Sequence, residues 1–270
     1  MKITVVTPTF NSAGKIAENV KSVLKQNYDD YEHIFIDNLS TDHTLDKITE
    51  LYSDSGKLGK IQIVSERDNG ISDAFNKGIQ LAQGEIIVIL NSDDEFIPDT
   101  LFTDISELFL LNPDAGFIHG DILFEDFKYG TSIRKPLLCP PEEAMPFNHP
   151  TMFVQKKVYD KTGLFDIKNR FCMDYDLIVR WHKEYPEIYN SGFYANKYPM
   201  VKMSAGGISW SNELDMLEEM YSVVNKYGLN SDFAHKKLMQ RKRRVKLKLF
   251  LERLGLNGLV KVWRKYKWGN

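Results

Sequence analysis

Three adjacent acidic residues, Asp93, Asp94 and Glu95, lie just beyond an uninterrupted aliphatic run at 86–90, with Asn91 and Ser92 between. Five consecutive aliphatic residues are typical of a strand that is buried on both faces of a parallel sheet. Adjacent carboxylates repel one another, so such a cluster needs water or a cation to neutralise it. The cluster therefore predicts a site for a hard cation. A solvated turn that caps the next helix is an equally weighted alternative.

Two further polar loops end apolar stretches earlier in the chain. The first is Thr7-Pro8-Thr9-Phe10-Asn11, and the second is Asp37-Asn38. The carboxyl ends of parallel strands meet at one edge of a sheet, so we expect these loops and the acidic cluster to converge on one crevice. A carboxylate at position 37 can bind ribose hydroxyls or a base N–H. A helix-capping acid is the plainer alternative.

Alternating strands and helices must position these loops. Apolar stretches predict strands at 3–7, 33–36 and 61–65 as well as at 86–90, with Pro8 ending the first. Apolar residues at helical spacing follow each strand, and Ser12 offers an N-cap to the first helix. Four strand–helix alternations within roughly the first 110 residues predict an α/β protein with a doubly wound, mostly parallel sheet.

The rest of the chain has a different pattern, and 116–210 is expected to continue the same sheet and to hold a second substrate. Strands are predicted at 117–124, 131–134 and 151–154, and helices at 171–181, 212–226, 234–253 and 258–267. We expect one domain over 1–211, divided into halves at 1–115 and 116–211. A helical extension follows over 212–270.

Composition narrows the class of protein. A hydrophobic content of 43% and a charged content of 27% are ordinary for a globular protein. The two cysteines are too few for a disulfide framework or a Cys-based zinc site, so we expect a reducing, cytoplasmic compartment. The first residues do not have the pattern of a signal peptide, and no apolar run reaches the roughly 20 residues that span a bilayer.

Two nucleotide-binding motifs are absent from the loop that follows the first predicted strand. A G-x-G-x-x-G fingerprint is missing, which argues against a nicotinamide or flavin enzyme. A Walker A loop is missing too, which argues against a P-loop NTPase.

Taken together, the loop sequences resemble the family 2 glycosyltransferases. The match is specific over the first 100 residues or so, in four runs: Thr7–Asn11, Ile36–Asp42, Glu66–Gly78 and Asn91–Asp94. It continues more loosely through His149-Pro150, Gly163–Asp166, Asp174–Leu177 and Gly206–Ser209. The resemblance implies the GT-A fold and transfer of a sugar from a nucleotide-sugar donor.

The resemblance also implies roles for individual residues. Asp37 corresponds to the acid that contacts the nucleotide base, and Asn91–Asp94 corresponds to the metal-binding D-x-D, with Asn91 in place of the first Asp. Asp93 and Asp94 are then the metal ligands, and Asp174 is the catalytic base. The expected nucleotide-sugar-binding residues are Thr7, Pro8, Thr9, Asn11, Asp37, Asp68, Asp73, Asn76, Asn91, Ser92 and Asp93. His149 and Trp210 are candidates for the acceptor side, with a core histidine as an equally weighted alternative for His149.

The chemistry of these roles is independent of the family. A nucleoside diphosphate leaving group develops negative charge that Mn²⁺ or Mg²⁺ stabilises, and these ions prefer carboxylate oxygens. An attacking hydroxyl needs a carboxylate to accept its proton, and a single base gives inversion at the anomeric carbon. Asp174 could instead be a helix-dipole acid, with Asp176 as a surface residue and Asp166 or Asp121 as other candidates for the base.

We therefore expect an inverting, metal-dependent glycosyltransferase that builds a bacterial surface polysaccharide or glycolipid. UDP-sugars are the expected donors, and a saccharide or lipid-linked saccharide is the expected acceptor. A sugar nucleotidyltransferase is the rival enzyme, disfavoured because no glycine-rich loop bearing Arg and Lys follows the first strand. A catalytically inactive sugar-nucleotide-binding module is the rival from another class, favoured only by Asn91.

The end of the chain is strongly basic. Residues 236–270 hold 13 Lys and Arg and one Glu, whereas the preceding 235 residues hold 22 basic and 36 acidic residues. Basic residues interleaved with apolar ones, with Trp263, Tyr266 and Trp268 at the end, predict a peripheral contact with anionic lipid on the inner face of the cell membrane. Nucleic acid is the competing polyanion, and packing on the acidic body is the plainer alternative.

Overall fold

The computed structural model describes residues 1–127, 130–206, 212–229, 231–260 and 262. Its first half alternates strands with helices. The elements are β1 (Ile3–Thr9), α1 (Ile16–Leu24), β2 (Tyr31–Asp37), α2 (Thr44–Asp54), a 3-10 turn η1 (Leu58–Lys60), β3 (Ile61–Ser65), α3 (Ile71–Leu81), β4 (Ile86–Ile89), β5 (Glu95–Phe96) and α4 (Leu101–Leu111).

The second half adds strands to the same sheet and then ends in helices. Its elements are β6 (Phe117–Asp126), β7 (Gly130–Arg134), η2 (His149–Thr151), β8 (Phe153–Gln155), α5 (Lys156–Thr162), α6 (Met173–Glu184), α7 (Pro186–Tyr189), β9 (Gly192–Ser204), α9 (Glu213–Lys226) and α10 (Asp232–Arg253). The predicted helix at 258–267 lies mostly outside the described residues.

The described strands form one nine-stranded sheet in the order β3-β2-β1-β4-β8-β6-β9-β5, with β7 paired to β6. β1 to β4 are parallel, so their carboxyl ends share one edge, as the sequence predicted. β8 then runs antiparallel to both β4 and β6. The second half therefore extends the first sheet and forms no second one.

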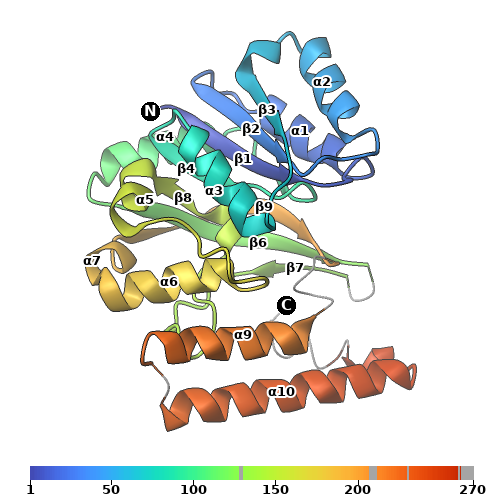
Figure 1. The fold of residues 1–270 in the computed structure, drawn as a ribbon, viewed down its shortest axis with the longest axis vertical. Coiled ribbons are helices and arrows are strands. Elements are labelled where there is room, and N and C mark those ends of the chain that lie inside the picture. The colour runs from blue at the N-terminus through green and yellow to red at the C-terminus, as the bar shows by residue number, and fades with distance from the viewer. Residues whose placement is uncertain (128–129, 207–211, 230, 261, 263–270) are drawn as a thin grey trace.

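Helices cover both faces of this sheet (Figure 1). Along β2, Phe35 packs with residues of α1 and α2, while Ile34 and Ile36 pack with residues of α3 on the other face. This alternation is the period of two that a strand imposes on its side chains. A Cβ at Gly78 of α3 would lie 2.2 Å from Val6 Cγ1, so glycine lets α3 approach β1 closely.

Two local predictions were wrong. Pro8 does not end the first strand, because β4 pairs with β1 only as far as Val6 and no ladder hydrogen bond is lost beyond it. Ser12 does not cap α1 with its side chain. Instead its backbone carbonyl accepts hydrogen bonds from the backbone N–H groups of Lys15 and Ile16, and its hydroxyl lies 2.9 Å from the Ser92 hydroxyl.

The two C-terminal helices stand apart from the sheet. Figure 1 shows α9 lying along α6, with α10 on the far side of α9. Apolar residues of α9, among them Leu217 and Val224, pack with Tyr175 and Val179 of α6 and with Leu238 of α10. Among the described residues, no helix is both long and apolar enough to cross a membrane.

Candidate active site

The carboxyl edge of the parallel strands is organised around Asp37. This side chain is fully buried and lies in register with Thr9 of β1 and Ser65 of β3. Its Oδ1 accepts hydrogen bonds from the hydroxyls of Thr9 (3.0 Å) and Ser40 (2.5 Å). Its Oδ2 accepts from the Ser65 hydroxyl (2.7 Å) and the Ser40 N–H (3.0 Å). Asp37 thus joins three strand ends and has four donors within the protein.

The loops after β1 and β2 are joined to each other. Asn11 receives a hydrogen bond from the Thr41 N–H at its Oδ1 (2.9 Å), and its own N–H donates to the Ser40 hydroxyl (2.9 Å). Asn11 and Leu39 both adopt left-handed backbone conformations, with φ of 47° and 54°. Such conformations cost free energy for residues other than glycine and are concentrated at functional sites. The two loops therefore form one rigid rim.

This rim carries two exposed apolar side chains that our list of candidates omitted. Phe10 is 59% exposed and Leu39 is 49% exposed. A residue at the end of a core strand is normally buried, so an exposed aromatic ring here indicates a surface that is available to a bound molecule. A phenyl ring gives a flat face on which a base can stack. The signal that could have found Phe10 is its place directly after β1.

The turn that follows β4 lies against the loop after β1. The Ser92 and Ser12 hydroxyls are 2.9 Å apart, and Lys15 Nζ lies 3.1 Å from Asp93 Oδ2. The Asp93 side chain keeps 26% of its surface exposed. The structure therefore brings Asp93 to the same edge as Asp37 and the rim, which was the expected convergence.

The chemistry of this turn fits a hard cation. Burial, together with the charge of Asp93, raises the pKa of the Asp94 carboxyl well above its ordinary value. Asn91 donates to Asp94 Oδ2 (3.2 Å), while its own Oδ1 is buried and has no hydrogen-bond partner. Two carboxyls and an unsatisfied amide oxygen are ligands that Mg²⁺ and Mn²⁺ accept. Within the described ranges, no group of three or more Asp, Glu, His or Cys side chains could hold a metal ion. The protein side chains at this turn would therefore not complete the coordination of a cation, and a bound molecule would have to supply further oxygens.

Two other candidates have structural partners. Thr7 is buried and lies 2.8 Å from the His33 imidazole inside the core. The Asn76 amide exchanges two hydrogen bonds of 2.9 Å with the backbone of Phe165. Because their polar atoms are occupied, we leave Thr7 and Asn76 out of the proposed binding set.

Two acidic candidates shape the loop that leads into α3. Asp68 Oδ1 accepts from the Gly70 N–H (2.9 Å), and Asp73 accepts from the Asn69 N–H (2.9 Å). Gly70 has a φ of 110°, which a side chain would oppose, so the loop depends on glycine. The Asp68 N–H donates to Asn38 (3.1 Å), which ties this loop to the one after β2.

Asp174 lies in the first turn of α6 and is half-buried. The segment that precedes it is held against the start of α3. Ser72 donates to the Asn169 carbonyl (3.2 Å), and Asn76 holds Phe165. Since α3 begins beside the carboxyl end of β3, these contacts hold the segment that leads into α6 near that edge.

The two acceptor-side candidates differ in outcome. His149 packs between Phe75 and Phe165, with ring centroids 5.9 Å away in each case. Burial lowers the pKa of the His149 imidazole, and the nearby charge of Asp174 partly opposes this. The structure thus brings His149 close to the candidate base. Trp210 lies outside the described residues.

The interpretation of Asp176 as a surface residue was wrong. Asp176 is fully buried, and its Oδ1 lies 2.8 Å from Lys226 Nζ on α9. Although burial opposes the charge, hydrogen bonds to Asp176 and Asp166 raise the pKa of the Lys226 ammonium. A carboxylate in the first turn of a helix often faces solvent, but here a cation from a later helix allows it to be buried.

The family expectation is confirmed. The sequence profile of the family described as glycosyl transferase family 2 matches residues 4–160, which is more than half of the chain. The chain belongs to this family and is a transferase enzyme.

Individual relatives share its sequence at a moderate level. The chain is 26% identical over 196 residues to the putative colanic acid biosynthesis glycosyl transferase WcaA of Escherichia coli, covering 68% of this chain and 67% of that protein.

Solved structures share its fold. S. aureus TarS 1–349 in complex with UDP has a TM-score of 0.63 and 17% identity, covering 90% of this chain and 71% of that one. The mannosyltransferase PcManGT from Pyrobaculum calidifontis, in complex with GDP-Man and Mn²⁺, has a TM-score of 0.64 and 15% identity, covering all of this chain and 76% of that one. These similarities confirm the GT-A-like α/β fold.

Proposed function

We propose that this enzyme transfers a sugar, with inversion, from a UDP-sugar to a saccharide or lipid-linked saccharide acceptor in bacterial surface polysaccharide biosynthesis. The observation that carries the proposal is the convergence of Asp37, the rim loops and Asp93 at one edge of the sheet. That WcaA is named for colanic acid biosynthesis and TarS was solved with UDP supports the pathway class and the donor class.

The nucleoside is proposed to lie on the rim formed by the loops after β1 and β2. Phe10 offers a stacking face, and Asp37 with Thr9 forms the polar floor at the strand ends. Because Asp37 already has four donors, we expect it to fix the shape of this floor, with the Pro8 and Asn11 backbone and the Asp68 and Asp73 loop completing the wall. Ser92 and Lys15 lie toward the diphosphate.

A divalent ion, Mn²⁺ or Mg²⁺, is proposed at the turn after β4. Asp93 and Asp94 would hold it, with the unsatisfied Asn91 oxygen as a further ligand. When bound, the ion would stabilise the negative charge of the departing diphosphate. Deprotonation of Asp94 is required for this role, so we expect ion affinity to rise with pH. The PcManGT complex with Mn²⁺ supports the assignment.

Asp174 is proposed as the general base. Its carboxylate accepts the proton of the acceptor hydroxyl as the hydroxyl oxygen forms a bond to the anomeric carbon. The bond from that carbon to the diphosphate oxygen breaks on the opposite face, so the configuration inverts. His149, which lies near Asp174, is proposed to line the acceptor side.

The basic C-terminal helix is proposed to contact an anionic membrane surface. Leu247, Phe250 and Leu254, at spacings of three and four, are each about 57–58% exposed on one face of α10 and the residue that follows it. Exposed cations that form no ion pair within the described part of the chain surround this stripe: Arg243, Arg244, Lys246 and Arg253. An apolar stripe bordered by cations suits anionic lipid better than nucleic acid, which offers no apolar interior.

Domain boundaries remain as first proposed, with the transferase domain over 1–211 and the extension over 212–270. The sheet runs through both proposed halves, 1–115 and 116–211, so we regard these halves as functional and not as separately folded.

The test is calorimetric titration with UDP and a panel of nucleotide-sugars, in Mn²⁺ and in EDTA. We expect UDP affinity to fall at least about tenfold in EDTA, since the ion joins protein and diphosphate. Asp93→Asn should reproduce that loss, and EDTA should not weaken UDP binding further in this variant. Asp99→Asn, an exposed neighbour, is the matched control. UDP affinity that neither EDTA nor Asp93→Asn changes would contradict the metal assignment.

A sugar-nucleotide-binding module without transferase activity is the second candidate, because Asn91 replaces an acid. Release of UDP from the best donor of the panel, in the presence of saccharide acceptors, separates the two. Tight binding without any release would favour the inactive module.

A further inference from the structure

The start of α6, which carries the proposed base, is held by a helix from the C-terminal extension. The Glu219 carboxylate of α9 accepts hydrogen bonds from the backbone N–H groups of Phe171 and Cys172, each at 3.0 Å. The Cys172 thiol donates to the Met216 carbonyl of α9 (3.3 Å). The N–H of the N-cap residue Cys172 has no partner within the helix, so an outside carboxylate that accepts from it and from the preceding Phe171 is stabilising.

No residue of the local sequence performs this capping. Cys172 is the N-cap of α6, and no side chain caps the helix from that position. Asp174 itself accepts from the N–H of Tyr175 (2.8 Å). The direction of the Asp174 side chain therefore depends on a short stretch of backbone that Glu219 holds in place from two residues away.

A second contact of α9 lies one turn further along α6. Lys226 binds the buried Asp176 (2.8 Å) and also Asp166 (2.9 Å), which belongs to the segment that leads into α6. Glu219 and Lys226 are two turns apart on α9, so they hold α6 at two points. This arrangement fixes both the position and the rotation of the helix.

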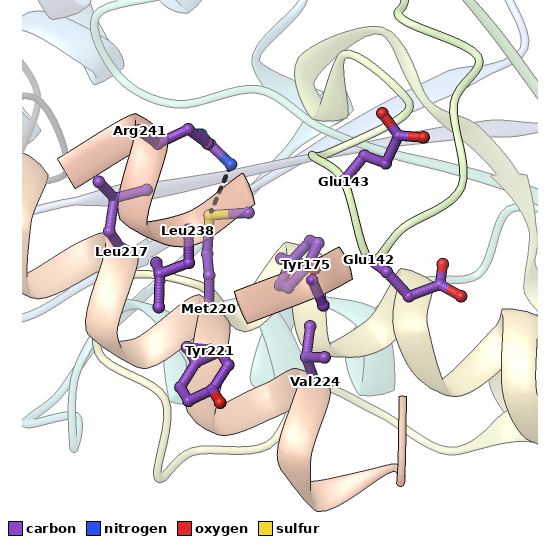
Figure 2. A pocket seen from close by; sticks show the side chains of 10 residues that line it. Glu142, Glu143, Tyr175, Leu217, Met220, Tyr221, Val224, Leu238 and Arg241 are labelled. Carbon is purple, nitrogen blue, oxygen red and sulfur yellow. Dashed lines mark hydrogen bonds between the residues drawn. The ribbon is translucent and has the colours of Figure 1, made fainter. Parts of the chain in front are cut away.

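The position of α9 is in turn fixed by α10. Figure 2 shows Leu217, Met220 and Val224 of α9 facing Leu238 and Arg241 of α10, with Tyr175 of α6 beside them. Lys248 of α10 lies 2.5 Å from Glu213, the first residue of α9. None of the side chains around this small hollow belongs to the strand-end cluster of Asp37 and Asp93, so it is not the donor site.

We propose that Glu219 is a positioning residue of the transferase: it fixes the N-terminus of α6 and thereby the direction of the Asp174 carboxylate. The inference rests on the proposed role of Asp174 as the base. It assigns the extension over 212–270 a part in catalysis, through a contact that lies outside residues 4–160, the part of the chain that the family profile matches. A misplacement of about 1 Å in a reacting group can cost on the order of 100-fold in rate.

The test is a double-mutant cycle on donor turnover, measured as UDP released from the best donor of the binding panel. Glu219→Ala should lower kcat by about 100-fold, and Glu219→Gln by about tenfold, because its amide oxygen can still accept from both N–H groups but carries no charge. UDP affinity should stay within about twofold in both variants. Glu218→Gln is the matched control, since Glu218 pairs with Lys242 of α10 and has 62% of its side chain exposed.

The cycle separates positioning from a merely structural role. In an Asp174→Asn background, Glu219→Gln should lower the residual rate no further, because the group it positions is gone. An equal loss in both backgrounds would overturn the inference, as would an unchanged kcat in Glu219→Gln when Asp174→Asn is inactive. If Asp174→Asn itself keeps its rate, the proposed base is wrong, which is a different failure. Glu219→Gln keeps the shape of the side chain, so it carries the test if the alanine variant does not fold.

Discussion

The parallel-strand half of the sheet and the α9–α10 pair are stabilised in different ways. In β1, β2 and β4, nearly every side chain is buried, and most are aliphatic or aromatic. In α10, which has 22 residues, the buried residues are Ala234, Leu238 and Lys248. Besides the apolar packing of Ala234 and Leu238 against α9, three ion pairs hold this helix: Lys237, Lys242 and Lys248 pair with Glu143, Glu218 and Glu213.

The two regions differ in which interactions determine how they pack. Burial of apolar area is non-directional, so a strand that is apolar enough finds the core with little help from any one partner. An ion pair contributes only if both partners are present and well placed. The packing of the sheet half should therefore depend less on any single ion pair, whereas the extension should depend on a few named pairs.

The largest expected effect on stability comes from removing Lys226. Lys226→Met leaves the Asp176 carboxylate buried without its cation, so we expect the free energy of unfolding to fall by about 3 kcal/mol. Lys21→Met removes an exposed pair with Glu18 on α1, and we expect a change below about 1 kcal/mol. Urea unfolding measures the free energy of unfolding of both variants. Equal losses in the two would contradict the view that the buried pair stabilises more than the exposed one.

A smaller effect distinguishes the sheet half by its response to acid. Burial lowers the pKa of His33 to about 3 and that of His119 to about 4, so both stay neutral in the folded protein. The unfolded chain takes up these protons as pH falls below about 6.5, so stability is present above that pH and is lost below it. Each histidine should cost about 2 kcal/mol between pH 7 and pH 5.

His33→Gln measures this contribution directly. The variant can keep contacts with Thr7 and Tyr52 but cannot take up a proton, so its loss between pH 7 and pH 5 should be about 2 kcal/mol smaller than that of the parent. His43→Gln is the matched control, because His43 has 85% of its side chain exposed. A pH response of His33→Gln that equals the parent's would show that His33 is not buried as a neutral group.

The smallest effect tests the outward face of the extension. Arg243→Gln removes one exposed cation, so binding to vesicles that contain phosphatidylglycerol should weaken by about 1 kcal/mol, or roughly fivefold. Lys242→Gln on the same helix removes an inward cation that pairs with Glu218, and binding should stay unchanged. Sedimentation with vesicles at two salt concentrations measures both. Equal loss in the two variants would mean that net charge, and not this face, decides the binding.

Predictions from sequence were correct where local apolar patterns or motifs determine the structure, and failed where partners distant in the sequence determine it. The aliphatic run at 86–90, the inward face of α3 and the position of Asp174 near the start of a helix all follow from periodicity or from family motifs, and the structure confirms them. Burial of Asp176 could not be predicted, because its partner Lys226 is 50 residues further along the chain. The same holds for Glu219, whose function depends on how α9 packs.

Within the candidate site, the acids at strand ends were predictable in position but not in contacts. That Asp37 lies at the end of a strand is evident from the sequence, whereas its four donors come from three separate loops and strands. The exposure of Phe10 and the bond between Asn76 and Phe165 depend on loop geometry in the same way. Local sequence determines which residues lie at the carboxyl ends of the strands. Long-range packing determines which of them keep polar atoms without a partner inside the protein.

The rate of UDP release by Asp174→Asn tests the central claim most directly. Loss of a positioned general base typically costs 10²–10⁴-fold, so we expect turnover to fall by about that factor while UDP affinity stays within a few-fold. Asp160→Asn, an exposed acid on α5, is the control and should keep its rate. Asp176→Asn is unsuitable as a control because Asp176 is buried. A normal rate in Asp174→Asn, or a product that retains the donor's anomeric configuration, would contradict the account.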